Sequence, residues 1–175
     1  VLSPTLEMAQ MFYSSNGVPI NEDNTLDFTD IEELREAGQD DRFNIQLGYE
    51  TSILNFNREP RFYADLGFDG SIWYKYDAGS EDTRFHIEGK YTDYAGSNHA
   101  FYFNVTGYYL KKLVNWNQSF SSSGATYRSY AWPEMRLADL YLMYAEALNE
   151  VSGPSATVYD YLDRIRTRAG LEGVQ

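Results

Sequence analysis

The last third of the chain places apolar residues at the spacing of an α-helix. In Met135–Glu150 the apolar positions follow one another in steps of three and one, and a second stripe runs through Val158–Ala169. Such stripes predict two amphipathic helices, and the Gly- and Pro-containing segment between them predicts a tight connection. We therefore predict a tetratricopeptide-like αα-hairpin over about residues 135–169, within a unit of residues 131–175. A single hairpin leaves apolar surface uncovered, so we expect further chain, or residues 1–130, to cover it.

The first 130 residues show shorter and more mixed patterns. Ser3 and Pro4 predict the start of a helix, which Asn16 and Gly17 end. A capping box at Thr29–Glu32 predicts a second short helix that stops at Gly38. Asp69-Gly70 between apolar residues predicts a β-hairpin with a type I′ turn, which needs positive φ at both central positions.

The middle of the chain is rich in polar and turn-forming residues. Asp77–Asn98 predicts a long irregular loop, a kind of segment that often carries function. Phe101–Thr106 predicts a strand, which Tyr108–Val114 extends, and Ser119–Gly124 predicts a second polar loop. Together with the C-terminal hairpin, these patterns predict a mainly α-helical fold with short β-hairpins and long irregular loops.

Charge narrows the classes of partner. The chain carries 26 acidic and 14 basic residues, a formal net charge of -12. Nucleic acids and anionic lipid headgroups are bound through Lys and Arg, so we expect neither as a partner. The chain has no cysteine, which excludes disulfides, thiol catalysis and Cys-ligated metal centres. The sequence shows neither a membrane-spanning apolar run nor a signal-peptide pattern.

Aromatic residues make up 17% of the chain, with 16 Tyr, 10 Phe and 3 Trp. A tyrosine ring has flat apolar faces and a polar tip, which suits half-solvated binding surfaces. Aromatic faces also stack on the C–H faces of sugar rings, a contact that a neutral ligand can make with an acidic protein. Burial in the core is the alternative for each of these rings.

Catalytic and metal-binding patterns are weak. The two histidines, His86 and His99, lie in or beside the long loop, and no hydrolase, metalloprotease or phosphate-loop motif accompanies them. Adjacent acids such as Asp40 and Asp41 leave a glycosidase open as a minor alternative. Oxygen-bearing residues from Asn21 to Glu32 match the spacing of an EF-hand, but the loop lacks the glycine that its sharp turn needs. We predict no metal and no cofactor, with a structural calcium ion as a weak alternative.

Five segments occur together and in a characteristic order: Pro4–Met8, Asn57–Tyr63, Thr106–Lys112, Trp132–Glu150 and Ile165–Leu171. In combination they resemble the C-terminal half of the SusD/RagB family. Trp132–Glu150 is similar to the hallmark helix of that family, and Ile165–Leu171 is similar to the end of the next helix. Asp163 departs from the family pattern, in which we expect Asn before the Ile–Arg pair.

The resemblance implies a SusD-like fold built on tetratricopeptide-like hairpins, with residues 1–175 forming one incomplete C-terminal-type region. It implies a surface-exposed lipoprotein of the cell outer membrane, attached through an N-terminal lipid outside this chain. Such proteins bind oligosaccharide or polysaccharide without catalysis and pass it to a TonB-dependent, SusC-type transporter. The matching segments themselves are expected to pack the fold and not to contact the sugar.

Residues that contact the sugar are expected in the loops. The candidates are aromatic and polar residues in or beside the two predicted loops: Tyr91, Tyr94, Phe85, His86, Asp93, Asn98, Trp116 and Asn117. Two alternatives stay open. The chain could be a protein–protein scaffold of the transporter complex without glycan contact, the usual role of helical-hairpin arrays, or it could be a glycoside hydrolase.

Overall fold

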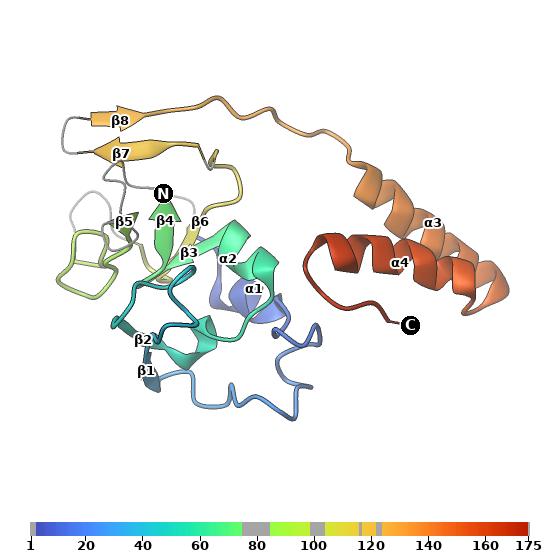
Figure 1. Ribbon diagram of the computed structural model, residues 1–175, viewed down its shortest axis with the longest axis horizontal. Coiled ribbons are helices and arrows are strands. Elements are labelled where there is room, and N and C mark those ends of the chain that lie inside the picture. Colours follow the sequence, from blue (N-terminus) through green and yellow to red (C-terminus); the bar gives the residue numbers. More distant parts are fainter. Residues whose placement is uncertain (1–2, 75–84, 99–103, 116, 122–123, 175) are drawn as a thin grey trace.

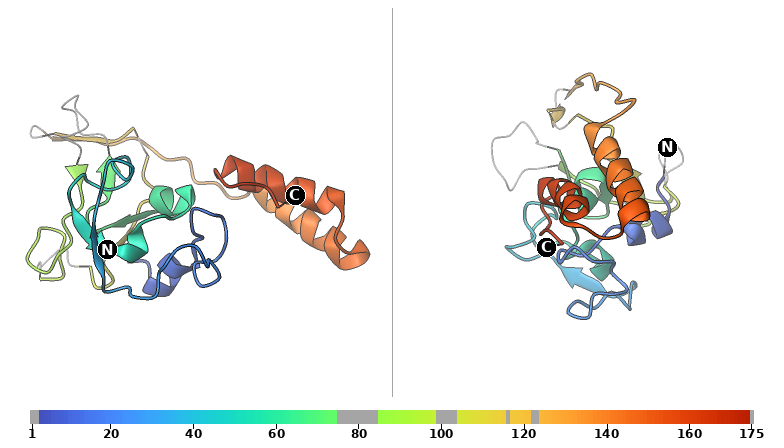
Figure 2. Two further views of the ribbon diagram at one scale, coloured as in Figure 1. Left: turned by 60° about the horizontal axis from the view of Figure 1, so that its bottom comes forward. Right: turned by 90° about the vertical axis from the view of Figure 1, so that its right-hand side faces the viewer.

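The computed structural model describes residues 3–74, 85–98, 104–115, 117–121 and 124–174. A body of short helices, short strands and loops is followed by two longer helices, which project from it (Figures 1 and 2). Helices account for 29% of the structure. The mainly α-helical class is therefore not confirmed, because short strands and loops supply most of the remainder.

The first helix is shorter than its sequence pattern suggests. Helix α1 spans Leu6–Met11, and the side chain of Thr5 caps it by accepting a hydrogen bond from the Met8 amide at 3.1 Å. The prediction placed the start at Ser3 and the end at Asn16. The chain leaves the helix earlier because the Ser15 amide donates to the carbonyl of Asn57 at 2.7 Å, which ties this segment to the centre of the body.

The predicted helix after Thr29 is wrong. The Thr29 hydroxyl donates to Asp27 Oδ1 at 2.6 Å and caps no helix. Strand β1, Leu34–Glu36, pairs antiparallel with β2, Glu50–Ser52. A short 3₁₀ turn, Ile53–Asn55, follows β2. A local capping signal was therefore overruled by pairing with a distant strand.

The Asp69-Gly70 turn is present, but it does not close a hairpin. The Ser71 amide donates to the Phe68 carbonyl at 2.9 Å, and Gly70 has φ +85°. Among the described residues other than glycine, a positive φ is found at Asn57 and not at Asp69, so the turn is not type I′. Turns of the unprimed types splay the strands that they join.

The two strands beside this turn accordingly belong to different ribbons. Strand β3, Leu66–Phe68, follows helix α2, Pro60–Asp65, and pairs with β6, Tyr108–Leu110. Strand β4, Ile72–Tyr74, pairs with β5, Phe85–His86. The predicted Asp69-Gly70 hairpin is therefore wrong in its pairing, and the predicted irregular loop contains a strand.

Two further predictions concern the segment around β6. Residues 101–103 of the predicted strand lie outside the described residues, and Asn104 begins a turn that leads into β6. The buried Asn104 side chain accepts from the amides of Thr106 and Gly107 and donates to the Tyr108 carbonyl at 2.6 Å. Beyond β6, the predicted polar loop instead forms strands β7, Ser119–Ser121, and β8, Gly124–Thr126, which pair antiparallel.

The core of the body is centred on Phe62 of α2, which is fully buried. Its ring lies 5.7 Å from that of Phe12, 5.3 Å from that of Phe68 and 6.5 Å from that of Tyr108. These rings come from α2, β3, β6 and the segment after α1. Burying aromatic side chains of this size supplies much of the stabilisation of a small core.

The predicted αα-hairpin is present. Helix α3 spans Leu137–Ser152 and α4 spans Ala156–Arg168, and the two helices pack on each other. Ala138 and Ala145 of α3 and Val158 of α4 are buried. Gly153, with φ +72°, ends α3, and the Ser155 hydroxyl caps α4. The body does not cover all the apolar side chains of α3, since Leu137, Met143 and Val151 are more than half exposed.

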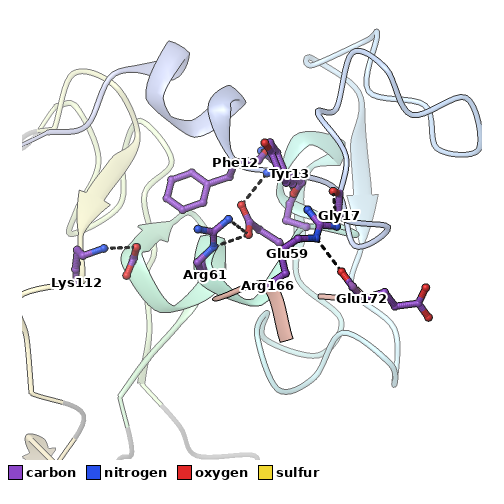
Figure 3. A network of polar contacts seen from close by, with 10 residues as sticks. Phe12, Tyr13, Gly17, Glu59, Arg61, Lys112, Arg166 and Glu172 are labelled. Carbon is purple, nitrogen blue, oxygen red and sulfur yellow. Dashed lines mark hydrogen bonds and ion pairs between the residues drawn. The ribbon is translucent and has the colours of Figure 1, made fainter. Parts of the chain in front are cut away.

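The hairpin meets the body at the C-terminal end of α4. Arg166 donates to the Gly17 carbonyl at 3.1 Å and to the Glu172 carbonyl at 2.8 Å (Figure 3). Leu171 is buried here, and Gly170 packs against the ring of Pro60. This contact, called the α4 latch below, consists of Arg166, Gly170 and Leu171 against Gly17 and Pro60.

Candidate functional site

The Asn57–Tyr63 segment is a packing element. Arg58 is 3% exposed, and its guanidinium donates to the carbonyls of Ala9, Phe12 and Leu54 at 2.6–2.7 Å. Burial lowers the pKa of Arg58 to about 10. Buried Glu59 accepts from the Tyr13 amide at 2.9 Å and pairs with Arg61 at 2.6 Å (Figure 3). These charges are engaged within the protein, so this segment does not present a ligand site.

A half-buried cation, Lys111, lies between α2 and β4. Lys111 Nζ donates to the carbonyls of Tyr63 at 3.0 Å and Ile72 at 2.8 Å, and burial lowers the pKa of Lys111 to about 8. The neighbouring Lys112 pairs with Asp65 at 2.8 Å (Figure 3). Both lysines join the segment after β6 to α2, which is a structural role.

The candidate ligand-binding loop is residues 87–98, which follow β5. Tyr91 is 67% exposed and Tyr94 is 68% exposed, and the two are three positions apart in the chain. Exposed tyrosines of this size offer ring faces to a ligand. The structure therefore leaves two of the predicted aromatic candidates on the surface, as a sugar-stacking role requires.

The loop is held by hydrogen bonds within itself. The Asp93 amide donates to the Lys90 carbonyl at 2.9 Å, and the Asp93 carboxylate accepts from the Lys90 amide at 3.1 Å. The Ala95 amide donates to the Glu88 carbonyl at 3.0 Å, and the Asn98 amide to the Tyr91 carbonyl at 3.3 Å. A loop closed in this manner restricts the backbone that carries Tyr91.

Four of the other predicted candidates lie in β5 or in the loop itself. Phe85, which is 42% exposed, and His86 belong to β5 at the start of the loop. His86 packs edge-on against Tyr49, with ring centroids 5.5 Å apart, and its Nε2 lies 3.5 Å from Glu88 Oε1. Asp93 and Asn98 are in the loop itself, where Asn98 is exposed.

Asn117 lies on another segment than this loop. Trp116 lies outside the described residues, and Asn117 is exposed between β6 and β7, where its amide donates to Asn115 Oδ1 at 2.9 Å. Figures 1 and 2 place the β7–β8 ribbon apart from loop 87–98. The structure thus gathers the candidates from Phe85 to Asn98 and leaves Asn117 elsewhere.

The acidic segment with EF-hand-like spacing binds its own side chains. Hydrogen bonds from the side chains of Ser14 and Thr25 lower the pKa of Asp23 well below its usual range. Hydrogen bonds from Thr29 lower the pKa of Asp27. Within the part of the chain that the structure describes, no group of three or more His, Asp or Glu side chains is arranged to hold a metal ion. The absence of a cofactor stays a prediction.

Further exposed aromatic residues lie on the segment that joins β8 to α3. Tyr127 is 73% exposed, Tyr130 44% and Trp132 71%. In the sequence, Trp132 was singled out only as the first residue of the segment similar to the hallmark helix, although α3 begins at Leu137. The sequence signal that could have indicated these exposed residues is the number of aromatic residues among polar ones in this segment. That pattern does not distinguish an exposed extended segment from a buried one.

The helices that the structure describes include none that is long and apolar enough to span a bilayer.

Comparisons with known proteins agree with the resemblance seen in the sequence. The family model described as the SusD family matches residues 1–175. Two solved structures of BT4246, a SusD-like protein from Bacteroides, are similar to this chain, each with a TM-score of 0.80 over 99% of it. Sequence identity is 29% for the selenomethionine form and 28% for the other, and the chain spans 29% and 28% of their lengths. A comparison with curated proteins found no match.

Proposed function

The chain belongs to the SusD family, and from this membership we propose that it serves the non-catalytic capture of oligosaccharide at the cell surface. Members of the family generally bind glycans for uptake without catalysis, associate with SusC-type transporters, and are outer-membrane-associated lipoproteins. For this chain, the proposal is that bound oligosaccharide passes to a partner TonB-dependent transporter of the SusC type. The protein is further proposed to be a lipoprotein exposed on the cell outer membrane, as family members generally are.

The observation that carries the site assignment is the exposure of Tyr91 and Tyr94 on a loop closed by its own hydrogen bonds. A sugar ring presents C–H groups on its faces and hydroxyls around its rim. Tyrosine faces can stack on the former, while Asp93, Asn98 and His86 supply acceptors and donors for the latter. Phe85, Trp116 and Asn117 are proposed as further contacts on the same grounds of residue type.

Binding of this kind breaks no bond. Each stacking contact contributes on the order of 1 kcal/mol beyond the buried area. Two such contacts with a few hydrogen bonds to solvated groups give weak, reversible binding, which suits a ligand that must be released to a transporter. A net charge of -12 favours neutral over anionic cargo, because like charges repel.

The hairpin of α3 and α4 is proposed to be one tetratricopeptide-like unit of a larger array. Its exposed apolar residues, such as Leu137 and Met143, support this because such units bury their faces by stacking. Since the chain spans less than a third of the solved relatives, we propose that residues 1–175 are one C-terminal-type region of a longer protein. In that region, residues 1–130 carry the loops and residues 131–175 carry the hairpin.

The experiment is a panel of neutral and acidic polysaccharides in affinity electrophoresis with the full-length protein, followed by calorimetry. Replacing Tyr91 and Tyr94 together by Ala should weaken binding roughly 10- to 100-fold, the loss of two contacts of about 1 kcal/mol or slightly more. Tyr127→Ala is the matched control, since Tyr127 is equally exposed on another segment. Binding unchanged in the double variant would refute the site.

The same panel separates the alternative functions. Retardation by no polysaccharide would favour a scaffold that contacts the transporter but not the glycan. Release of reducing sugar during incubation would favour a glycosidase. Within the described residues, no observation specifically supports either alternative.

A further inference from the structure

The side chains of Asp69 and Tyr109 attach loop 87–98 to the body, beside the backbone hydrogen bonds of Ile87. Asp69, the residue of the turn between β3 and β4, accepts at one oxygen, Oδ1, from the Gly89 amide at 2.7 Å and from the Tyr49 hydroxyl at 2.7 Å. On the other side of the loop, the Tyr109 hydroxyl of β6 donates to the Ala95 carbonyl. The attachments therefore fall at the beginning and the end of the segment that carries Tyr91 and Tyr94.

The first attachment is supported by its surroundings. The Gly70 amide donates to the Ile87 carbonyl at 2.8 Å, and Ile87 is buried. The Tyr49 ring contacts His86 edge-on and lies beneath Lys90 Nζ at 4.7 Å. Burial and, second, the Asp69 hydrogen bond raise the pKa of Tyr49, so its hydroxyl keeps its proton and stays a donor.

The second attachment also depends on a tyrosine hydroxyl that keeps its proton. Burial, and then the charge of Asp69, raise the pKa of Tyr109. Its hydroxyl therefore also remains a donor to the loop. Within the loop, a Cβ added at Gly96 would lie 1.9 Å from the Lys90 carbonyl oxygen. The tight turn at residues 90–96 thus tolerates no side chain at that position.

We propose that Asp69 and Tyr109 are positioning residues, which hold loop 87–98 in the conformation that presents Tyr91 and Tyr94 to an oligosaccharide. The inference rests on the proposed function and names residues that do not touch the sugar. A loop that is ordered before binding loses less backbone and side-chain entropy when the ligand binds. Loss of either attachment should therefore weaken binding while both tyrosine rings are retained.

The hydrogen bonds can be removed selectively. Asp69→Ala removes the acceptor for Gly89 and Tyr49, whereas Asp69→Asn keeps an oxygen that can accept both hydrogen bonds. Tyr109→Phe removes only the hydroxyl. Asp41→Ala is the matched control, because the half-buried Asp41 also accepts from a backbone amide, that of Gly38 at 3.0 Å, but in another loop.

The probes are maltohexaose, cellohexaose and xylohexaose, titrated calorimetrically into the full-length protein and each variant. Asp69→Ala and Tyr109→Phe should weaken binding about 5- to 30-fold, as expected for one to two ordered residues. Asp69→Asn should stay within about threefold of the parent protein, and Asp41→Ala should not change the affinity. Hydrogen exchange of the Gly89 and Ala95 amides should accelerate in Asp69→Ala and Tyr109→Phe, but not in Asp41→Ala.

The outcomes separate this inference from the proposed function. If Tyr91→Ala and Tyr94→Ala weaken binding but Asp69→Ala and Tyr109→Phe do not, the positioning role is wrong and the site stands. If affinity falls in Asp69→Ala with unchanged exchange in the loop, or falls equally in Asp41→Ala, the effect is a general loss of stability and the inference fails. Binding of none of the three hexasaccharides by the parent protein would overturn both.

Discussion

Replacement of Arg58 by Ala should destabilise the body more than any change to a surface charge. Arg58 is 3% exposed and donates to the carbonyls of Ala9 at 2.6 Å, Phe12 at 2.7 Å and Leu54 at 2.7 Å. Its guanidinium also lies over the Phe62 ring at 4.4 Å. The variant would leave three carbonyls without this donor and open a gap beside the central ring of the core.

The magnitude follows from two opposing terms. A buried carbonyl left without a partner costs about 2 kcal/mol, so three cost about 6 kcal/mol. The opposing term is the cost of burying the Arg58 charge. Burial lowers the pKa of Arg58 from 12.5 to about 10, which corresponds to a desolvation cost of about 3 kcal/mol that the Ala variant does not have. With the lost packing on Phe62, we expect the free energy of unfolding to fall by about 3–5 kcal/mol, a large share of the stability of an ordinary domain.

The assay is urea unfolding of the full-length protein at pH 7, followed by tryptophan fluorescence. Arg35→Ala is the control, because Arg35 also lies over a ring, that of Phe56 at 4.4 Å, but its side chain is 44% exposed. We expect that control to cost no more than about 1 kcal/mol. If Arg58→Ala costs no more than Arg35→Ala, the account of Arg58 as the buried donor that satisfies the end of α1 is refuted.

Three further predictions concern other features of the fold. Gly17→Ala should loosen the α4 latch, because φ at Gly17 is +74° and the added Cβ would lie 2.7 Å from Arg166 Nη2. Limited proteolysis between the body and α3 should then accelerate. Gly107→Ala is the control and should not accelerate it, because φ there is +73° but nothing lies within 4 Å of the added Cβ. Lys111→Met should remove part of the pH dependence of the free energy of unfolding. The pKa of Lys111 is about 8 in the folded protein and 10.5 ordinarily, so between these pH values the unfolded state binds more protons. The contribution of Lys111 to stability therefore rises with pH, by up to about 3 kcal/mol. Urea unfolding at pH 7 and pH 10 measures it, and a pH-independent difference between parent and variant would contradict it. Asn104→Ala should lower the free energy of unfolding by about 2–3 kcal/mol, since its buried side chain satisfies two amides and one carbonyl; thermal unfolding beside Asn104→Asp, which keeps the acceptors, tests this.

The sequence predicted those elements whose stabilising contacts are local. The stripe of Met135–Glu150 and the break around Gly153 gave the αα-hairpin, because helix periodicity and a C-terminal glycine act within a few residues. The Thr29 capping signal failed because residues 34–36 pair with residues 50–52, a contact that no local pattern encodes. The Asp69-Gly70 turn was found, but its strands pair with β5 and β6, which no local signal indicates.

The candidate site was predictable to a similar degree. Tyr91 and Tyr94 were expected in an irregular loop and are exposed there. The roles of Asp69 and Tyr109 could not be foreseen, since both act from strands and turns that lie beside the loop only in three dimensions. Ser119–Gly124 was predicted as a loop because serine and glycine have low strand propensity, yet Ser119–Ser121 pair with Gly124–Thr126.

The pairing of β3 with β6 has a consequence for how the chain folds. Leu66 must meet Leu110 across a long intervening stretch of chain, whereas α3 and α4 join neighbouring residues. Closing a long loop carries a larger entropic cost before any contact compensates it, and a two-stranded ribbon alone is only marginally stable. The helical hairpin should consequently form early in refolding, and the β3–β6 ribbon late, once the rings around Phe62 have collapsed into place.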